Sequence, residues 1–157
     1  MLNAIANPAM VLRCTAVVLF TLISSSVFAG RAIPDPCKLI TVAELEEIVG
    51  KISKGPKPAD PESEEVSCEY TVAKDSSWLM INLHEGNFDL MRKSIGGKSP
   101  VPVPELAKDA FLNEDYEDFS AELFAKKGDL TLRVSMPKGP SAGDKIKAIA
   151  KKALARL

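Results

Sequence analysis

The sequence predicts an α+β fold, in which an antiparallel sheet built from two hairpins packs against two or three helices and one disulfide crosslinks the domain. Residues 67–83 and 119–136 each contain two apolar runs joined by a short polar turn, as hairpins do. Three other stretches repeat apolar residues at helical spacing. Two cysteines follow an N-terminal leader, which favours a structural disulfide.

The first helix is predicted to begin at Thr41, because Thr41 and Glu44 have the spacing of a capping box. Gly50 is predicted to end it. Its apolar positions are Val42, Leu45, Ile48 and Val49. Residues 51–65 contain three prolines and several charges, which predicts an exposed loop.

Residues 67–73 and 78–83 predict the first hairpin, because apolar and polar residues alternate in the first run and turn residues separate the two. Asn87 is predicted to cap a short second helix that runs to Ile95. Two glycines then close this helix.

The second half of the chain repeats this order and adds a short strand. Residues 98–104 alternate proline with valine, so we expect extended chain that is not a central strand. Residues 109–112 predict a short strand, and residues 113–118 predict an acidic turn. The second hairpin follows, and Ser141 is predicted to be the N-cap of the last helix. The apolar stripe of that helix consists of Ile146, Ile149, Ala150, Ala153, Leu154 and Leu157.

Residues 1–29 have the plan of a secretory signal peptide. Arg13 is their only charged residue, an apolar run of about ten residues follows it, and residues 27–29 supply a small-residue cleavage site. The run is too short for a membrane-spanning helix, which needs about 20 apolar residues. We therefore expect cleavage after Ala29, a single α+β domain over residues 30–157, and a periplasmic or secreted location.

The leader also decides the roles of the cysteines. Cys14 leaves with the signal peptide, so Cys37 and Cys68 remain as an even pair in an oxidising compartment and are expected to form a disulfide. The alternative, a redox or metal pair, lacks a Cys-x-x-Cys spacing and has only one histidine to join it. Prolines precede Cys37 where a lipid-anchor signal has small residues, so no stable membrane anchor is expected after cleavage.

The charge of the chain excludes two classes of partner. It carries 20 Lys and Arg against 21 Asp and Glu, a net charge of −1. Nucleic acid is not an expected partner, because proteins that bind it present a basic face. No basic cluster is dense enough to hold an anionic membrane surface. The expected partner is an unknown ligand or an envelope protein.

Three short motifs resemble those of a group of small secreted bacterial domains of unknown function. Residues 35–45, Asp-Pro-Cys-Lys-Leu-Ile-Thr-Val-Ala-Glu-Leu, are similar to their Pro-Cys-x-Leu-Leu-Thr opening, and residues 68–70 are similar to their Cys-x-Tyr. Residues 104–111 resemble their Pro-Gly-Leu-Gly-Asp-x-Ala-Tyr segment. That segment departs from the pattern at Glu105, Ala107 and Phe111. The resemblance covers most of residues 35–157 and implies a compact α/β domain of the PsbP-like sandwich kind, with no established activity.

Residues 139–143 match Gly-x-Ser-x-Gly, in which a hydrolase serine stands at a sharp turn between a strand and a helix. The only histidine, His84, precedes Ser141, whereas in those hydrolases it follows the serine. Pro140 and further loop residues separate the strand from Ser141, and the domain is small for such a fold. We therefore interpret Ser141 as a helix cap, and a catalytic serine remains the alternative.

The other motifs predict no cofactor and no metal. Gly97-Lys98-Ser99 resembles the end of a phosphate-binding loop, but Arg92 stands where its first glycine belongs. His84 lacks a second histidine four residues on, so no zinc helix is present. The acidic turn at 113–118 lacks the spacing of a calcium-binding EF-hand.

A candidate pocket consists of Tyr70, Trp78 and Met80, which lie on neighbouring strands of the first predicted hairpin. Such residues are more often core than pocket. The function that these patterns favour is a non-catalytic periplasmic or secreted domain that binds a small molecule, a lipid or a partner protein. The alternatives are a small secreted serine hydrolase, acting through Ser141 or His84, and a purely structural envelope component.

Overall fold

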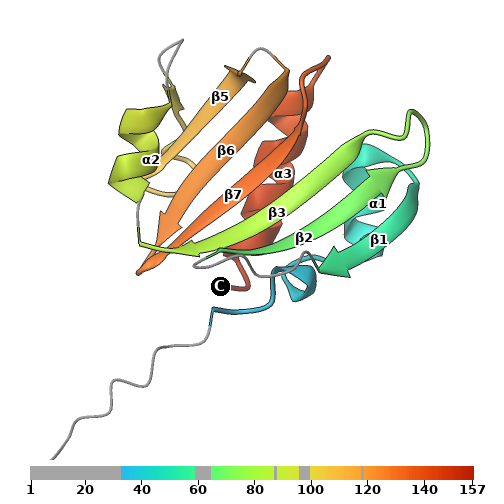
Figure 1. Ribbon diagram of the computed structural model, residues 1–157, viewed down its shortest axis with the longest axis horizontal. Coiled ribbons are helices and arrows are strands. Elements are labelled where there is room, and N and C mark those ends of the chain that lie inside the picture. The colour runs from blue at the N-terminus through green and yellow to red at the C-terminus, as the bar shows by residue number, and fades with distance from the viewer. Residues whose placement is uncertain (1–32, 59–64, 87, 96–99, 118) are drawn as a thin grey trace, which may run out of the picture. The chain divides into compact units, whose positions relative to one another are not determined.

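One antiparallel sheet of seven strands forms the centre of the described fold (Figure 1). The structure is a computed structural model, and it describes residues 33–58, 65–86, 88–95, 100–117 and 119–157. The predicted signal peptide, the predicted cap Asn87 and the Gly97-Lys98-Ser99 motif lie outside the described residues and remain predictions.

The strands stand in the order β1-β2-β3-β7-β6-β5-β4 across the sheet. Strands β1 to β3 form one antiparallel meander, β5 to β7 form another, and the two join where β3 pairs with β7. The strands are β1 (Ile52–Pro58), β2 (Glu65–Val72), β3 (Trp78–Glu85), β4 (Val101–Pro102), β5 (Ala110–Tyr116), β6 (Ser120–Lys127) and β7 (Leu130–Pro137).

The predicted sheet of two hairpins is wrong, because strands dominate the described chain and seven of them share one sheet. Both predicted hairpins are present within it, as β2 with β3 and β6 with β7. The prediction lacked β1, most of β5, and the pairing that makes the two hairpins continuous.

Strand β1 lies where the prolines and charges of residues 51–65 predict a loop. It is an edge strand, paired only with β2 through an irregular register, and every residue after Ile52 is exposed. Such a strand needs backbone pairing but no apolar face, so its sequence shows no alternation. Prolines at Pro56 and Pro58 are compatible with an edge, because an edge strand leaves some amides unpaired.

Strand β5 extends through the residues that predict an acidic turn, to Tyr116. At the edge of β5 that faces away from β6, only the first part of the strand is paired, because β4 pairs with Phe111 and Leu112 and no further. The later residues, including Glu114, therefore sit at an open sheet edge where charge is tolerated. In the described part of the proline-valine segment, residues 100–104, Val101–Pro102 form this short edge strand, and no central strand is seen there, as the prolines predict.

Helix α1 (Val42–Val49) begins and ends as predicted. Glu44 N donates to Thr41 Oγ1 at 3.3 Å, and Thr41 N donates to Glu44 Oε2 at 2.9 Å, which confirms the capping box. Gly50 ends the helix with a φ of 86°, a left-handed value that glycine adopts without steric cost.

Helix α3 (Ala142–Leu154) begins after Ser141, which stands at the predicted N-cap position but does not cap the helix through its side chain. The Ser141 hydroxyl makes no capping hydrogen bond, and its backbone is left-handed with a φ of 60°. In place of a side-chain cap, Ala142 N donates to Gly139 O at 3.1 Å in a backbone turn.

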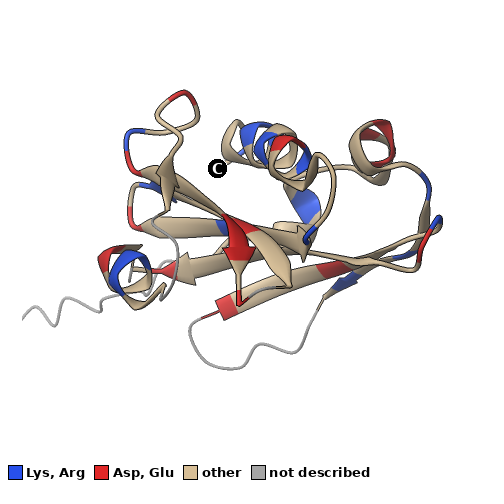
Figure 2. Ribbon diagram, turned by 90° about the horizontal axis from the view of Figure 1, so that it is seen from above, with Lys and Arg blue, Asp and Glu red and all other residues tan. Residues whose placement is uncertain are grey.

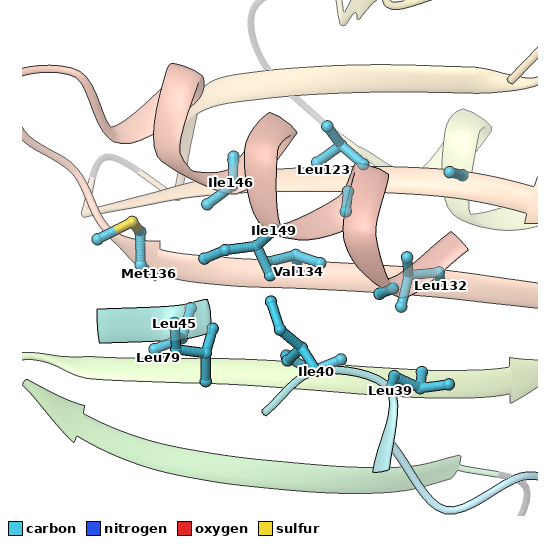
Figure 3. Close-up of a cluster of buried hydrophobic side chains, with 14 of the residues drawn as sticks. Leu39, Ile40, Leu45, Leu79, Leu123, Leu132, Val134, Met136, Ile146 and Ile149 are labelled. Atoms are coloured by element: carbon cyan, nitrogen blue, oxygen red, sulfur yellow. The ribbon is translucent and has the colours of Figure 1, made fainter. Parts of the chain in front are cut away.

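Helices α1 and α3 cover one face of the sheet, and α2 (Phe88–Ser94) lies on the other (Figure 2). We call these the inner face and the outer face. The inner face and its helices form the main core (Figure 3). Its fully buried members include Leu45, Leu79, Leu132, Val134, Ile146 and Ile149.

The predicted disulfide between Cys37 and Cys68 is confirmed, with an S–S distance of 2.01 Å. Cys37 lies in a short 3-10 helix, η1 (Pro36–Lys38), and Cys68 is fully buried in β2. The bond spans 31 positions and fixes the segment before α1 to the centre of the first meander.

A crosslink of this span restricts the unfolded chain, so its loss should lower stability. We expect the double variant Cys37→Ala, Cys68→Ala to lose about 3 kcal/mol of unfolding free energy in urea denaturation. Thiol titration of the denatured, unreduced protein should find no thiol from Cys37 or Cys68. Two free thiols in a chain processed after Ala29 would contradict the crosslink.

A polar network joins α1 to the C-terminus. Arg156 donates to both carboxylate oxygens of Glu44, at 2.8 and 2.9 Å, and to Leu39 O at 2.8 Å. These hydrogen bonds from Arg156, together with those from Thr41, hold the pKa of Glu44 far below its usual value of 4.5. The ionised carboxylate is therefore bound more tightly in the folded than in the unfolded chain.

The low pKa of Glu44 makes a testable contribution to acid stability. A carboxylate with a lowered folded pKa stabilises the fold above its unfolded pKa, and this contribution is lost as the pH falls below about 4.5. We expect Glu44→Gln to be less stable than wild type at pH 7, with the difference shrinking as the pH is lowered towards 2. Unfolding free energies measured across this range test it, with the exposed Glu47→Gln as the control. A pH-independent difference would contradict the assignment.

Candidate functional site

The outer face of the sheet carries polar side chains where a core would carry apolar ones. Residues directly opposite in an antiparallel pair share a face. Asn82 of β3 pairs with Arg133 of β7, which pairs with Phe124 of β6. Two residues further along β7, and so on the same face, Ser135 pairs with Glu122 of β6. These positions alternate with the buried apolar residues of the inner face.

Five polar residues of this face form what we call the outer polar cluster. They come from β2, β3, β6 and β7, so they lie far apart in the sequence. Its members are Glu65, Asn82, His84, Glu122 and Arg133. Asn82 and Glu122 are each only 2 % exposed, which is unusual for such residues.

Arg133 and Glu122 form a bidentate ion pair at the centre of the cluster. Arg133 Nε donates to Glu122 Oε2 at 2.9 Å, and Nη2 donates to Oε1 at 2.7 Å. The guanidinium also lies 5.7 Å from the ring centre of Phe124 and 5.9 Å from that of Tyr116. Burial opposes the charge of Arg133, but the hydrogen bonds and charge of Glu122 outweigh it and raise the pKa of Arg133. Arg133 therefore stays charged at neutral pH.

Glu65, Asn82 and His84 make up the other end of the cluster. Asn82 Nδ2 donates to Glu65 Oε1. His84 Nε2 lies 3.4 Å from the same oxygen but makes no hydrogen bond with it. Burial lowers the pKa of His84, Glu65 partly offsets this, and the charge of Arg133 lowers it further. The imidazole is therefore neutral at pH 7.

Three polar atoms on the outer face are buried without a hydrogen-bond partner among the described residues. They are Asn82 Oδ1, His84 Nε2 and Asn113 Nδ2. Asn113 stands opposite Glu122 on β5, and its other amide atom is used, because Oδ1 accepts from Asp115 N at 3.1 Å. Buried polar groups are normally paired, so atoms of this kind mark places where a bound molecule could supply the partner.

The structure separates the three residues of the predicted pocket. Tyr70 stands opposite Leu79 on the inner face, where it is 2 % exposed and its hydroxyl has no partner in the described chain. Burial, with the charge of Asp35, raises the pKa of Tyr70 to about 12. Trp78 and Met80 point to the outer face, on the same strand and the same side as Asn82. Only two of the three therefore border the outer polar cluster.

An aromatic cluster closes the opposite side of the outer face. Phe111 of β5 stacks on Phe124 with ring centres 5.0 Å apart, and Phe88 of α2 lies 5.4 Å from Phe111. Helix α2 is thus anchored over β5 and β6. The outer polar cluster lies between this aromatic cluster and the partly exposed strip formed by Trp78 and Met80.

The Gly-x-Ser-x-Gly motif lies away from the only histidine. His84 stands opposite Thr131 near the start of β7, whereas Ser141 follows its end at Pro137. Six residues of extended strand separate these ends by about 20 Å. A serine and its general base must be within hydrogen-bond reach, so Ser141 and His84 do not form a catalytic pair. The last glycine has a packing reason instead, because a side chain at Gly143 would collide with the carboxylate of Glu114.

The described residues bring no three His, Cys, Asp or Glu side chains into one metal-sized group. Of the acidic residues predicted as a turn, Glu114 and Asp115 lie in β5 and Glu117 follows its end, and Asp115 pairs with Lys138; Asp118 lies outside the described residues. None of the described helices is long and apolar enough to cross a membrane.

Comparisons with family models, with curated proteins and with solved structures found no match for this chain. The resemblance to small secreted bacterial domains therefore remains a prediction. The site rests on the geometry of the outer face alone.

Sequence reasoning missed most of the cluster, because its members come from four strands. One signal was available in the alternation of β7, where Arg133 interrupts Leu132, Val134 and Met136. An arginine between core positions points to the outer face, and Glu122 occupies the same kind of position in β6.

Removing one partner of the ion pair between Arg133 and Glu122 should lower the unfolding free energy more than replacing both partners with apolar residues. We expect Arg133→Met to lose about 3 kcal/mol of unfolding free energy, because it leaves the Glu122 carboxylate buried without its partner. The double variant Arg133→Met, Glu122→Leu should lose less than Arg133→Met alone, since neither buried charge remains. Urea denaturation of Arg133→Met, Glu122→Leu and the double variant completes the double-mutant cycle. Strictly additive losses would show that the pair is not coupled.

Proposed function

We propose that this protein is a non-catalytic binding domain of the periplasm or the extracellular space, and that its ligand is a small molecule bound on the outer face. The observation that carries the proposal is the unpartnered amide atoms of Asn82 and Asn113, in side chains that are 2 % and 4 % exposed. Leaving one such atom unpaired costs about 1–3 kcal/mol. A ligand that pairs with it removes this cost, which favours the bound state.

The surroundings of these atoms suit a small molecule with both polar and apolar parts. Asn82 Oδ1 offers an acceptor, so the ligand needs a complementary donor. Asn113 Nδ2 offers a donor, but it lies three strands away, at about 14 Å, so only a long ligand would reach both atoms. Trp78 is 37 % exposed and, with Met80, adds apolar contact area beside Asn82. Binding sites of small molecules typically combine an apolar lining with a few placed polar groups. A flat protein partner would reach such buried amides less readily.

The proposed location follows from the disulfide and the leader. A disulfide such as that between the half-buried Cys37 and the buried Cys68 persists in oxidising compartments and is rare in the cytosol. Residues 1–29 have the pattern of an export signal. Together these features support export of the domain, with the signal peptide removed.

A non-catalytic role agrees with the contents of the outer face. Arg133 and Glu122 neutralise each other, and His84 is neutral and lies far from Ser141. On the described part of this face the Ser120 hydroxyl donates to Glu122 Oε1 at 3.3 Å, but Ser120 is fully buried and Glu122 is held by Arg133, so this pair is not presented to a substrate as covalent catalysis requires. Binding is therefore the function that these residues support best.

Native mass spectrometry of the protein purified from its own host tests this proposal. We expect a non-covalent organic adduct on the wild type that is released on denaturation. Met80→Glu should abolish this adduct, because it would place a carboxylate in the partly exposed strip formed by Trp78 and Met80. Leu90→Glu is the matched control, since Leu90 is 62 % exposed on α2 and should leave the adduct unchanged. A wild type without an adduct, or an adduct equally abundant on Met80→Glu, would overturn the proposal.

A further inference from the structure

We propose that His84, Glu65 and Asn82 form a binding site for a divalent transition-metal ion of the zinc type. This inference goes beyond the proposed function, because the ion needs no contact with Trp78 and Met80, although it takes Asn82 Oδ1, the atom that the proposed organic ligand would otherwise contact. It places a chemically defined occupant at one end of the outer polar cluster. The argument comes from the spacing of the donor atoms, from an unpartnered buried oxygen, and from the ligand chemistry of the three side chains.

The spacing of His84 and Glu65 fits a shared metal ion better than a hydrogen bond. A histidine-to-carboxylate hydrogen bond brings nitrogen and oxygen to about 2.7–2.9 Å. His84 Nε2 lies 3.4 Å from Glu65 Oε1, with no hydrogen bond between them. Zinc binds nitrogen at about 2.0–2.1 Å and carboxylate oxygen at about 2.0–2.2 Å, so two tetrahedral ligands stand about 3.4 Å apart.

Asn82 supplies the third donor and holds the second one in place. Its Oδ1 has no partner in the described chain, although the side chain is 2 % exposed. Its Nδ2 donates to Glu65 Oε1, and a hydrogen bond of this kind orients a ligating carboxylate. Asn82 and His84 are two residues apart on β3, so they share the outer face, and Glu65 stands directly opposite His84. His84 and Glu65 therefore converge from two adjacent strands, with the amide of Asn82 beside them.

The donor set selects a zinc-type ion over a calcium- or magnesium-type ion. The imidazole of His84 is a ligand that zinc, copper and nickel accept, whereas calcium and magnesium prefer oxygen alone. The nearby charge of Arg133 would oppose a cation, but its bidentate pair with Glu122 neutralises it. Among the described residues no third His, Cys, Asp or Glu side chain joins His84 and Glu65 in a metal-sized group, so the ion keeps open positions for water.

The single histidine of the chain makes the site directly observable. Zinc chloride titrated into untagged protein, processed as its host processes it, should bind with one ion per chain in isothermal titration calorimetry. Long-range ¹H–¹⁵N correlation spectra should show the Nε2 resonance of His84 shifting on zinc addition, and no other histidine can obscure it. Calcium chloride at the same concentration should leave the resonance unchanged.

Three variants and a matched control locate the site. His84→Gln, Glu65→Gln and Asn82→Leu should each weaken zinc binding by about tenfold or more. Glu69→Gln should not, although Glu69 lies on the same strand and the same face as Glu65, because its carboxylate lies 3.9 Å from the exposed Lys57 ammonium. Met80→Glu, which removes the proposed organic ligand, should leave zinc bound, so the two proposals can fail separately.

Zinc that binds without shifting the Nε2 resonance, or as tightly to His84→Gln as to wild type, would overturn the inference, as would the absence of zinc binding. Thermal unfolding monitored by circular dichroism identifies any variant that fails to fold. The wild-type resonance then decides the matter, because that measurement needs no substitution.

Discussion

The pairing of β3 with β7 is the contact on which the rest of the structure depends. It joins two meanders that are distant in the sequence, and it sets Ile81 against Val134 and Leu83 against Leu132 on the inner face. The same register sets Asn82 against Arg133 on the outer face. A shift of one residue would exchange the faces and bury Arg133 under the helices, so the apolar core fixes the position of the polar cluster.

The two faces of the sheet meet opposite physical demands. The inner face is closed by α1 and α3, and the disulfide and the contact of Arg156 with Glu44 hold its covering segments in place. The outer face is covered by described structure at one side, where α2 rests on Phe111 and Phe124. Between α2 and Trp78 the side chains are polar yet buried, which stabilises a fold poorly. The packed inner face fixes the strands, and the fixed strands hold the buried polar side chains of the outer face in place.

The elements that sequence alone could predict are those determined by local chemistry. The capping box at Thr41, the helix end at Gly50 and the alternation of β2, β3, β6 and β7 all depend on neighbouring residues. Strand β1 could not be predicted this way, because an exposed edge strand needs no apolar pattern. Ser141 failed as a cap because a backbone turn, which no residue type dictates, satisfies the helix instead.

The candidate site could be predicted only in fragments, for a reason that lies in sheet geometry. Tyr70, Trp78 and Met80 are close in sequence, yet a strand sends successive side chains to opposite faces, and the hairpin register placed Tyr70 away from the other two. Glu65, His84 and Arg133 come together only after three strands have paired. Local patterns show which residues face the same way along one strand. Which strands are neighbours is decided by the non-local pairing of β3 with β7, and a site that spans this junction depends on that pairing.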